Sequence, residues 1–227
     1  DGLVIGDGTV HKASGDLVLL EIGENDYDYY NCEISHLITK KRPGVGPYCH
    51  EINTTIEPGE LVRTFSRKIP DRFIFGGLNK KCSFLRGLFS ANGSLSGERV
   101  SLKATSLDVI EQAQIMLNSV GIQSYITTSK AKEIEFSNGI YTTKQSYDIN
   151  ITASRGKFSR IIGFIQNYKR EKLDSIIKKM GTTNFRKSTY DIVSVDLISE
   201  EETFDIAVDN PSHSYWKQGC NVSNCSE

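Results

Sequence analysis

The sequence predicts an α+β fold made of two related halves, followed by a short all-β segment. Three observations support this prediction. First, the segment Gly6–Val10 recurs in altered form as Ala91–Leu95, which indicates an internal repeat. Second, helical and strand-like patterns alternate through most of the chain. Third, helical periodicity is lost from about Thr183 onward. We therefore place a domain boundary near residues 182–188.

The composition is that of a water-soluble globular protein. Of the 227 residues, 38% are hydrophobic and 24% are charged, and no apolar run approaches the roughly 20 residues of a membrane-spanning helix. The first residues lack the basic and apolar regions of a signal peptide. Five cysteines without framework spacing indicate a reduced, intracellular protein, such as one in the cytoplasm of a prokaryote or a virus-infected cell. The net charge of −1 leaves local basic clusters as the only sign of nucleic-acid binding.

The elements after the second copy of the repeat are the clearest. Residues Arg99–Ala104 alternate as in a strand, and Ser106 then caps a helix that Gly121 ends. A strand over Gln123–Thr128 follows. Asn138-Gly139 predicts a tight turn, and with it a strand pair across Glu133–Ala153. Two helices are predicted after the pair, at Lys157–Gln166 and Lys169–Met180.

The remaining regions are less distinct. In the first half, strands are predicted at Leu17–Ile22 and Tyr48–Thr55, with a basic loop at Lys40–Pro47 between them. In the last part of the chain, short β-like runs occur without helical periodicity. These runs are Tyr190–Leu197, Thr203–Val208 and His213–Trp216.

Small residues recur four apart just before each copy of the repeat. Gly87 and Ala91 would share one face of a helix, and Gly2 and Gly6 repeat this spacing. Since a glycine inside a helix costs about 1 kcal/mol relative to alanine, the pattern predicts two helices that pack closely on each other. The alternative is a pair of ordinary helices that end at glycines and lead into turns.

Asp7 and Asn92 follow these small-residue faces directly. Each precedes a glycine, Gly8 or Gly93, which is predicted to take the left-handed conformation that ends many helices. A carboxylate at a helix C-terminus faces the negative end of the helix dipole and needs a nearby cation. If the two helices lie side by side, both side chains meet and could bind Mg²⁺ through oxygen atoms.

Several ordered blocks resemble the LAGLIDADG homing endonucleases of the type carried by inteins. Leu85–Gly93 (LRGLFSANG) resembles the LAGLIDADG motif, and Gly2–Gly8 (GLVIGDG) resembles the end of a first copy. Arg67–Asp71 (RKIPD) and Ser101–Ser106 (SLKATS) resemble the blocks on either side of the second motif. The resemblance implies two αββαββα repeats related by a pseudo-twofold axis in a monomer. It also implies binding to a long double-stranded DNA site and Mg²⁺-dependent cleavage.

The same resemblance implies roles for individual residues. Asp7 would be a metal-binding acid and Lys68 a basic residue near the scissile phosphates, with Lys157 as its counterpart in the second half. Asn92 occupies the second metal position, where the family pattern expects a carboxylate. An amide offers an oxygen atom but no charge, so we expect nicking or no cleavage more often than full cleavage of both strands.

The end of the chain resembles the C-terminal splicing blocks of inteins, at TFDIAV (203–208), HSY (213–215) and VSNCSE (222–227). The thiol of Cys225 would accept the acyl group from the upstream junction, and the Asn224 amide would then cyclise. Asp205 and His213 would move protons. Ser223 stands where inteins usually carry His, so cyclisation is expected to be slow.

These resemblances divide the chain into an endonuclease domain (1–184), a splicing segment (185–224) and the start of the flanking host protein (225–227). They imply a missing N-terminal splicing segment as a partner, because the chain opens inside the first motif. Two other readings stay open, namely a degenerate DNA-binding insert that serves only splicing, and a fragment with neither activity.

A zinc site is disfavoured because its candidate ligands match no usual spacing. These are Cys32, His36, Cys49 and His50.

Overall fold

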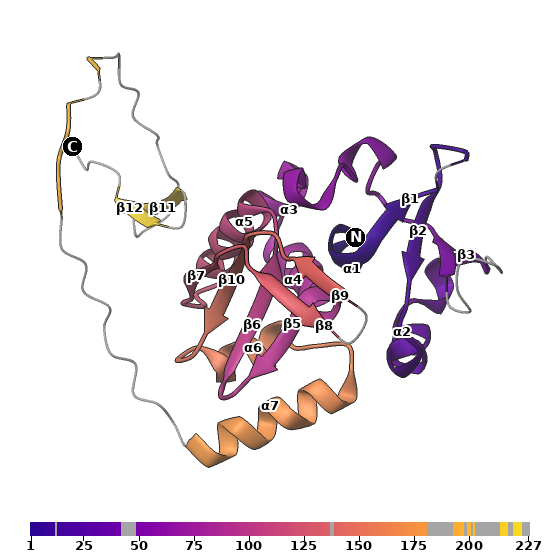
Figure 1. Cartoon of the computed structure of the whole chain (residues 1–227). Helices are drawn as coiled ribbons and strands as arrows, with labels where there is room; N and C mark the ends of the chain where they lie inside the picture. Colours follow the sequence, from indigo (N-terminus) through magenta and orange to yellow (C-terminus); the bar gives the residue numbers. More distant parts are fainter. Residues whose placement is uncertain are drawn as a thin grey trace.

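The structure is a computed structural model (Figure 1). It describes residues 1–11, 13–41, 49–136, 139–180, 193–197, 199–200, 202, 214–217 and 220–223. Within these ranges the fold is mixed α/β and contains two four-stranded antiparallel sheets. No helix in the described part of the chain is long and apolar enough to cross a membrane.

The first half carries the sheet with strand order β1-β2-β4-β3. Its elements are α1 (Gly2–Asp7), β1 (Gly8–Val10), β2 (Val18–Glu21), α2 (Tyr27–Ile34), β3 (Ile38–Lys41), β4 (Cys49–Ile52) and α3 (Asp71–Ile74). Short 3₁₀ turns accompany them, at η1 (Glu24–Asp26), η2 (Ser35–Leu37), η3 (Pro58–Glu60) and η4 (Thr64–Ser66). This is the expected order αββαββα.

The second half repeats this order and the matching strand arrangement, β5-β6-β10-β7. Its elements are α4 (Leu78–Asn92), β5 (Gly93–Ser96), β6 (Arg99–Ala104), α5 (Leu107–Ser119), β7 (Tyr125–Ser129), β10 (Ser146–Ile151), α6 (Arg155–Ile161) and α7 (Asn167–Met180). A hairpin of β8 (Glu133–Phe136) and β9 (Gly139–Thr142) is inserted before β10. The predicted strand pair across Glu133–Ala153 was thus incomplete, because β10 is a third strand that lies between β6 and β7.

Helices α1 and α4 lie side by side at the junction of the two halves (Figure 1). The glycines on their facing sides allow backbone-to-backbone contact. A Cβ atom added to Gly2 would lie 1.9 Å from the Phe84 carbonyl oxygen, and one added to Gly6 would lie 2.5 Å from the Ala91 Cβ atom. The close packing predicted from the small-residue spacing is confirmed, and it brings the C-terminal ends of both helices together.

Helix α5 begins at the predicted cap and links the two halves. The Ser106 hydroxyl accepts a hydrogen bond from the Val109 backbone nitrogen at 3.3 Å, which satisfies one of the free donors at the helix start. The same hydroxyl donates to the carbonyl oxygen of Arg67 at 2.6 Å. Because Ser106 is buried, the cap also fixes the chain segment that carries Arg67.

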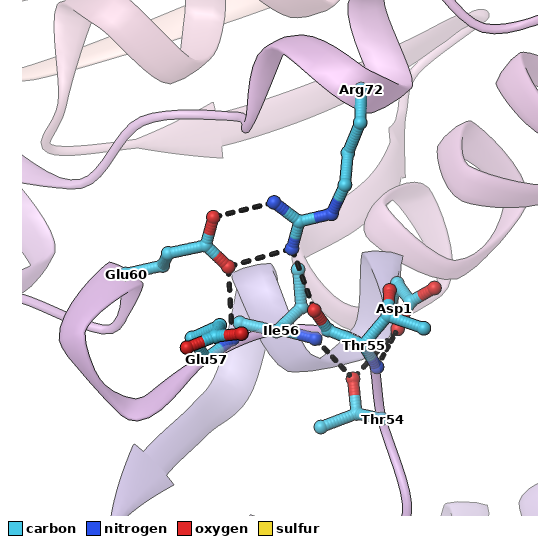
Figure 2. A network of polar contacts seen from close by, with 7 residues as sticks. All are labelled: Asp1, Thr54, Thr55, Ile56, Glu57, Glu60 and Arg72. Atoms are coloured by element: carbon cyan, nitrogen blue, oxygen red, sulfur yellow. Dashed lines mark hydrogen bonds and ion pairs between the residues drawn. The ribbon is translucent and has the colours of Figure 1, made fainter.

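A polar network anchors the segment that follows β4 to the start of α1 (Figure 2). The carboxylate of Asp1 accepts hydrogen bonds from the Thr54 hydroxyl at 2.7 Å and from the Thr55 backbone nitrogen at 3.0 Å. Arg72 donates to the Thr55 carbonyl oxygen at 2.7 Å and forms a two-pronged ion pair with Glu60 at 2.6 Å. The network therefore holds the N-terminus of α1 against α3.

Several predicted elements differ from the structure. Helix α6 ends at Ile161 instead of Gln166, because Gly163 takes a left-handed conformation with φ of 62°. The run Tyr190–Leu197 was predicted to be β-like, but its described part, residues 193–197, has no regular structure and Val193 is 97% exposed. Residues Thr203–Val208 lie outside the described residues. Near the third run, β11 (Ser214–Lys217) pairs with β12 (Cys220–Ser223).

Candidate functional site

The predicted pair Asp7 and Asn92 meets at one cavity of about 390 Å³. Asp7 is the last residue of α1, and Asn92 is the last residue of α4. The close approach of the helices brings them together, since a Cβ atom on Gly6 would also lie 3.6 Å from the Asn92 side-chain amide. Further lining residues come from both halves. They are Ile5, Thr64, Arg67, Lys103, Ala104, Thr105, Val109 and Ser146.

The glycines after the pair are required for a different reason from the one predicted. Gly8 and Gly93 have extended backbones, with φ of −70° and −88°, and not the left-handed conformation. At each of these glycines the chain turns sharply from helix to strand, and an added Cβ atom would collide with the preceding helical turn. It would lie 2.4 Å from the Val4 carbonyl oxygen at Gly8 and 2.2 Å from the Phe89 carbonyl oxygen at Gly93.

Arg67 holds the C-terminal end of α1. Its guanidinium group donates to the carbonyl oxygens of Ile5 at 2.8 Å, Gly6 at 3.3 Å and Gly8 at 3.1 Å. These carbonyls form the negative end of the helix dipole, so a buried cation stabilises them. Arg67 is only 5% exposed and also borders the cavity that contains Asp7.

Lys169 holds the C-terminal end of α4, as Arg67 holds that of α1. Its ammonium group donates to the carbonyl oxygens of Ser90 at 3.1 Å and Gly93 at 3.0 Å. In the internal repeat, Ser90 and Gly93 correspond to Ile5 and Gly8, which Arg67 contacts. The two halves therefore hold equivalent carbonyl groups with different cations.

The structure does not bring the two predicted lysines to this cavity. Lys68 extends away and pairs with Asp108 at 3.5 Å. Lys157 lies against Gly121, where an added Cβ atom would be 2.5 Å from its ammonium nitrogen. Arg67, the neighbour of Lys68 in the RKIPD block, lines the cavity together with Asp7. The cation at the cavity from the SLKATS block is Lys103.

A buried polar network connects the α2 region of the first half to the end of α4. The Tyr30 hydroxyl and the Gln166 amide both donate to the Ser90 carbonyl oxygen at 2.9 Å. Gln166 and Tyr168 donate to the two carboxylate oxygens of Asp26, at 3.2 and 3.0 Å. Asp26 is thus held near Lys169, and its charge opposes the lowering of the pKa of Lys169 that burial causes. Sequence reasoning found no role for Asp26 or Tyr30.

Asp7 opens to solvent through the cavity, but the protein around it displaces much of its water. This desolvation raises its pKa above the ordinary value of 3.8, although the nearby charges of Lys169 and Arg67 act in the opposite direction. A carboxylate whose pKa is higher in the folded than in the unfolded state costs stability once the pH exceeds its ordinary pKa. Ionised Asp7 therefore opposes folding at neutral pH.

We accordingly expect Asp7→Asn to raise the melting temperature at pH 7 and to have little effect below pH 3.8, where Asp7 itself is neutral in both states. The gain is small, since Asp7 is partly hydrated. Thermal unfolding at several pH values measures it. Asp16→Asn, which removes an exposed carboxylate outside the cavity, is the matched control. A gain that does not depend on pH would contradict the assignment to the charge of Asp7.

Two of the side chains at the cavity carry oxygen atoms that suit a divalent metal ion. One carboxylate, Asp7, and one amide, Asn92, are hard oxygen donors of the kind that Mg²⁺ prefers. In the described part of the chain, no group of three or more His, Cys, Asp or Glu side chains could hold a metal ion. Mg²⁺ is commonly held by one or two carboxylates together with substrate phosphates, which this arrangement permits.

The residues predicted to carry splicing lie outside the described residues. They are Asp205, His213, Asn224 and Cys225. The adjoining hairpin is described, and in it Ser214 of β11 pairs with Ser223 of β12.

Comparison with protein families matches residues 79–163 to the LAGLIDADG-like domain. The matched region runs from α4 to the end of α6 and so contains Asn92 and the second sheet. The first half of the chain lies outside the match, although it has the same element order.

Two curated relatives match the chain at low identity. A glutamine–fructose-6-phosphate aminotransferase of Methanocaldococcus jannaschii is 28% identical over 222 residues, which cover 88% of this chain and 18% of that protein. A probable translation initiation factor IF-2 of Pyrococcus horikoshii is 26% identical over 132 residues, which cover 57% of this chain and 11% of that protein. The chain thus spans less than a fifth of the length of either relative.

Similar solved structures include I-DmoI in complex with DNA and Mn. That match has a TM-score of 0.42 at 17% identity and covers 71% of this chain and 92% of that one. Full-length DUF199/WhiA from Thermatoga maritima matches with a TM-score of 0.46 at 14% identity, over 81% of this chain and 60% of that one.

Proposed function

We propose that this chain is a site-specific DNA endonuclease of the homing type, joined to the C-terminal part of a protein-splicing element. The observation that carries the proposal is the meeting of Asp7 and Asn92 at one cavity, at the ends of two closely packed and related helices. The match of residues 79–163 to the LAGLIDADG-like domain supports it independently.

The residues at the cavity suit the chemistry of phosphodiester cleavage. Arg67 and Lys103 supply positive charge where a DNA phosphate would lie, and Arg67 and Lys169 fix the helix ends that carry Asp7 and Asn92. Asp7 would orient the attacking water molecule. Asp7 and Asn92 would hold Mg²⁺, which would supply positive charge to stabilise the leaving oxygen.

The curated relatives support an inserted element. Their names describe an aminotransferase and a translation factor, two proteins of unrelated function, yet each shares only a small part of its length with this chain. A segment that is common to unrelated proteins behaves as an insert that is carried from gene to gene. This pattern agrees with a homing endonuclease inside a splicing element.

The splicing part of the proposal rests on the terminal residues. Ser214 and Ser223, which adjoin His213 and Asn224 in the sequence, pair across the β11–β12 hairpin. In this scheme the Cys225 thiol takes the acyl group from the upstream junction and frees the group that carried it. The side-chain amide nitrogen of Asn224 then attacks its own carbonyl carbon, which breaks the Asn224–Cys225 peptide bond and releases the flanking segment. We expect Asn224→Ala to leave the C-terminal junction intact, which mass spectrometry of the expressed protein would detect. Release of the segment after residue 224 by Asn224→Ala at the wild-type rate would contradict the scheme.

Asn92 makes the two halves of the site unequal. Of this pair only Asp7 carries a negative charge, so we expect one DNA strand to be cut much faster than the other. A second candidate function is DNA binding without cleavage, in an insert kept only for splicing. Asn92 also favours this second function, because an amide cannot act as a base and holds Mg²⁺ weakly.

The test uses protein from the complete gene and a supercoiled plasmid in which the coding sequences flanking the insert are directly joined. With Mg²⁺, we expect wild-type protein to yield nicked circles and Asn92→Asp to yield linear DNA. Gel electrophoresis separates the two forms. Equal cleavage of both strands by the wild type would refute the role of Asn92. Binding without any cut in either protein would favour the second candidate function.

A further inference from the structure

An exposed aromatic ring stands at the edge of the Asp7 cavity. Phe65 belongs to the turn η4 and is 46% exposed, and its neighbour Thr64 lines the cavity. The ammonium group of Lys144 lies 4.8 Å from the centre of the Phe65 ring. Lys144 precedes Ser146, which lines the same cavity from the second half. Phe65 and Lys144 thus come from opposite halves of the molecule and are in contact beside residues that line the cavity.

The position of this ring is fixed relative to Asp7. Two residues after Phe65, the Arg67 side chain is held by the carbonyl oxygens at the end of α1, and its own carbonyl accepts the Ser106 hydroxyl. Within the turn, the Ser66 backbone nitrogen donates to the Arg63 carbonyl oxygen at 2.8 Å. A ligand that packs on Phe65 therefore loses little binding energy to ordering of the chain.

The chemistry around the ring suits a nucleobase next to a phosphate. A base packs on an aromatic face through its own π-face, whatever its identity, and a nearby cation attracts the phosphate that follows it. Arg63 and Lys144 supply exposed positive charge near the turn. An apolar side chain inserted at a base step also unstacks the duplex and bends it.

We propose that Phe65 is the site on which one base of the bound DNA unstacks and packs, beside the phosphodiester presented to Asp7. Lys144 binds the adjacent phosphate and keeps its contact with the ring. The resulting bend brings the strand into the cavity, where Asp7 acts on it. This inference rests on the proposed function, since it requires that the chain bind double-stranded DNA.

The test places 2-aminopurine, a base whose fluorescence rises when it unstacks, in turn at each position near the cut in the joined-flank duplex. With wild-type protein, we expect a several-fold rise at one position. Phe65→Leu should remove this rise and weaken binding by about 5- to 100-fold, as measured by fluorescence anisotropy. Phe65→Trp should retain both properties. Phe75→Leu is the matched control, because Phe75 is 80% exposed and neither it nor its neighbours in the sequence line the cavity.

The outcomes separate this inference from the proposed function. Binding and cutting by the wild type without any fluorescence rise would overturn the role of Phe65 and leave the nuclease proposal standing. The same holds if Phe65→Leu and Phe75→Leu behave alike. A wild-type protein that does not bind the duplex would overturn both proposals.

Discussion

Asp7→Asn is expected to slow DNA cleavage by about 100- to 1,000-fold, with DNA affinity unchanged or slightly tighter. The magnitude follows from the several kcal/mol of charge stabilisation that a carboxylate-bound metal ion contributes. Among the described residues that line the cavity, Asp7 alone carries a negative charge, so no other lining residue can replace it. Affinity is preserved because the positive charge at the cavity, carried by Arg67 and Lys103, is unchanged and still attracts phosphates.

The measurement is a single-turnover nicking assay in Mg²⁺, combined with fluorescence anisotropy for DNA binding. Asp16→Asn serves as the control for loss of one negative charge, since Asp16 lines a different cavity. A wild-type rate in Asp7→Asn would remove Asp7 from the reaction. Loss of binding together with cleavage would instead assign Asp7 a structural role, which its expected gain in thermal stability argues against.

Gly87→Ala is expected to reduce the free energy of unfolding by about 1–3 kcal/mol. The added Cβ atom would lie 2.8 Å from the Leu3 backbone nitrogen and 3.2 Å from the Cα atom of Gly2, so the two helices must separate. Alanine favours a helix over glycine by about 1 kcal/mol, but the clash with backbone atoms outweighs this gain because backbone cannot rotate away. The separation also moves Asp7 away from Asn92, so cleavage should fall.

Urea unfolding followed by circular dichroism measures this change. Gly156→Ala is the matched control, because Gly156 also lies inside a helix, α6, and a Cβ atom there would meet nothing within 4 Å. We expect this control to stabilise the protein by about 0.4–1 kcal/mol. If Gly87→Ala were as stable as Gly156→Ala, the close packing of α1 on α4 would not be required.

Features that depend on neighbouring residues were predictable from the sequence. The strand Arg99–Ala104 was predicted with its observed bounds, and the cap of α5 was placed correctly at Ser106. The small-residue spacing correctly predicted that α1 packs on α4, because four-residue spacing in a helix determines which side chains share a face. The repeat likewise placed Asp7 and Asn92 together.

The cations of the site were decided by the tertiary structure. Arg67 and Lys169 contact equivalent carbonyl groups, but their distances along the sequence differ. Arg67 lies 62 residues after Ile5, and Lys169 lies 79 residues after Ser90. No repeat in the sequence marks such unequal positions, and the basic residue that the resemblance implied, Lys68, does not line the cavity. Which side chain reaches a helix end depends on how the chain packs around it.

The two related halves and the acid at the end of α1 could be predicted from the repeat and from helical spacing alone. The αββαββα order of the elements followed from the resemblance of the ordered blocks to a known family. The tertiary structure alone decided the extended conformation of Gly8 and Gly93, the insertion of β10 between β6 and β7, and the cations that hold the helix ends. These features depend on steric fit and charge between residues far apart in the chain, which no local pattern records.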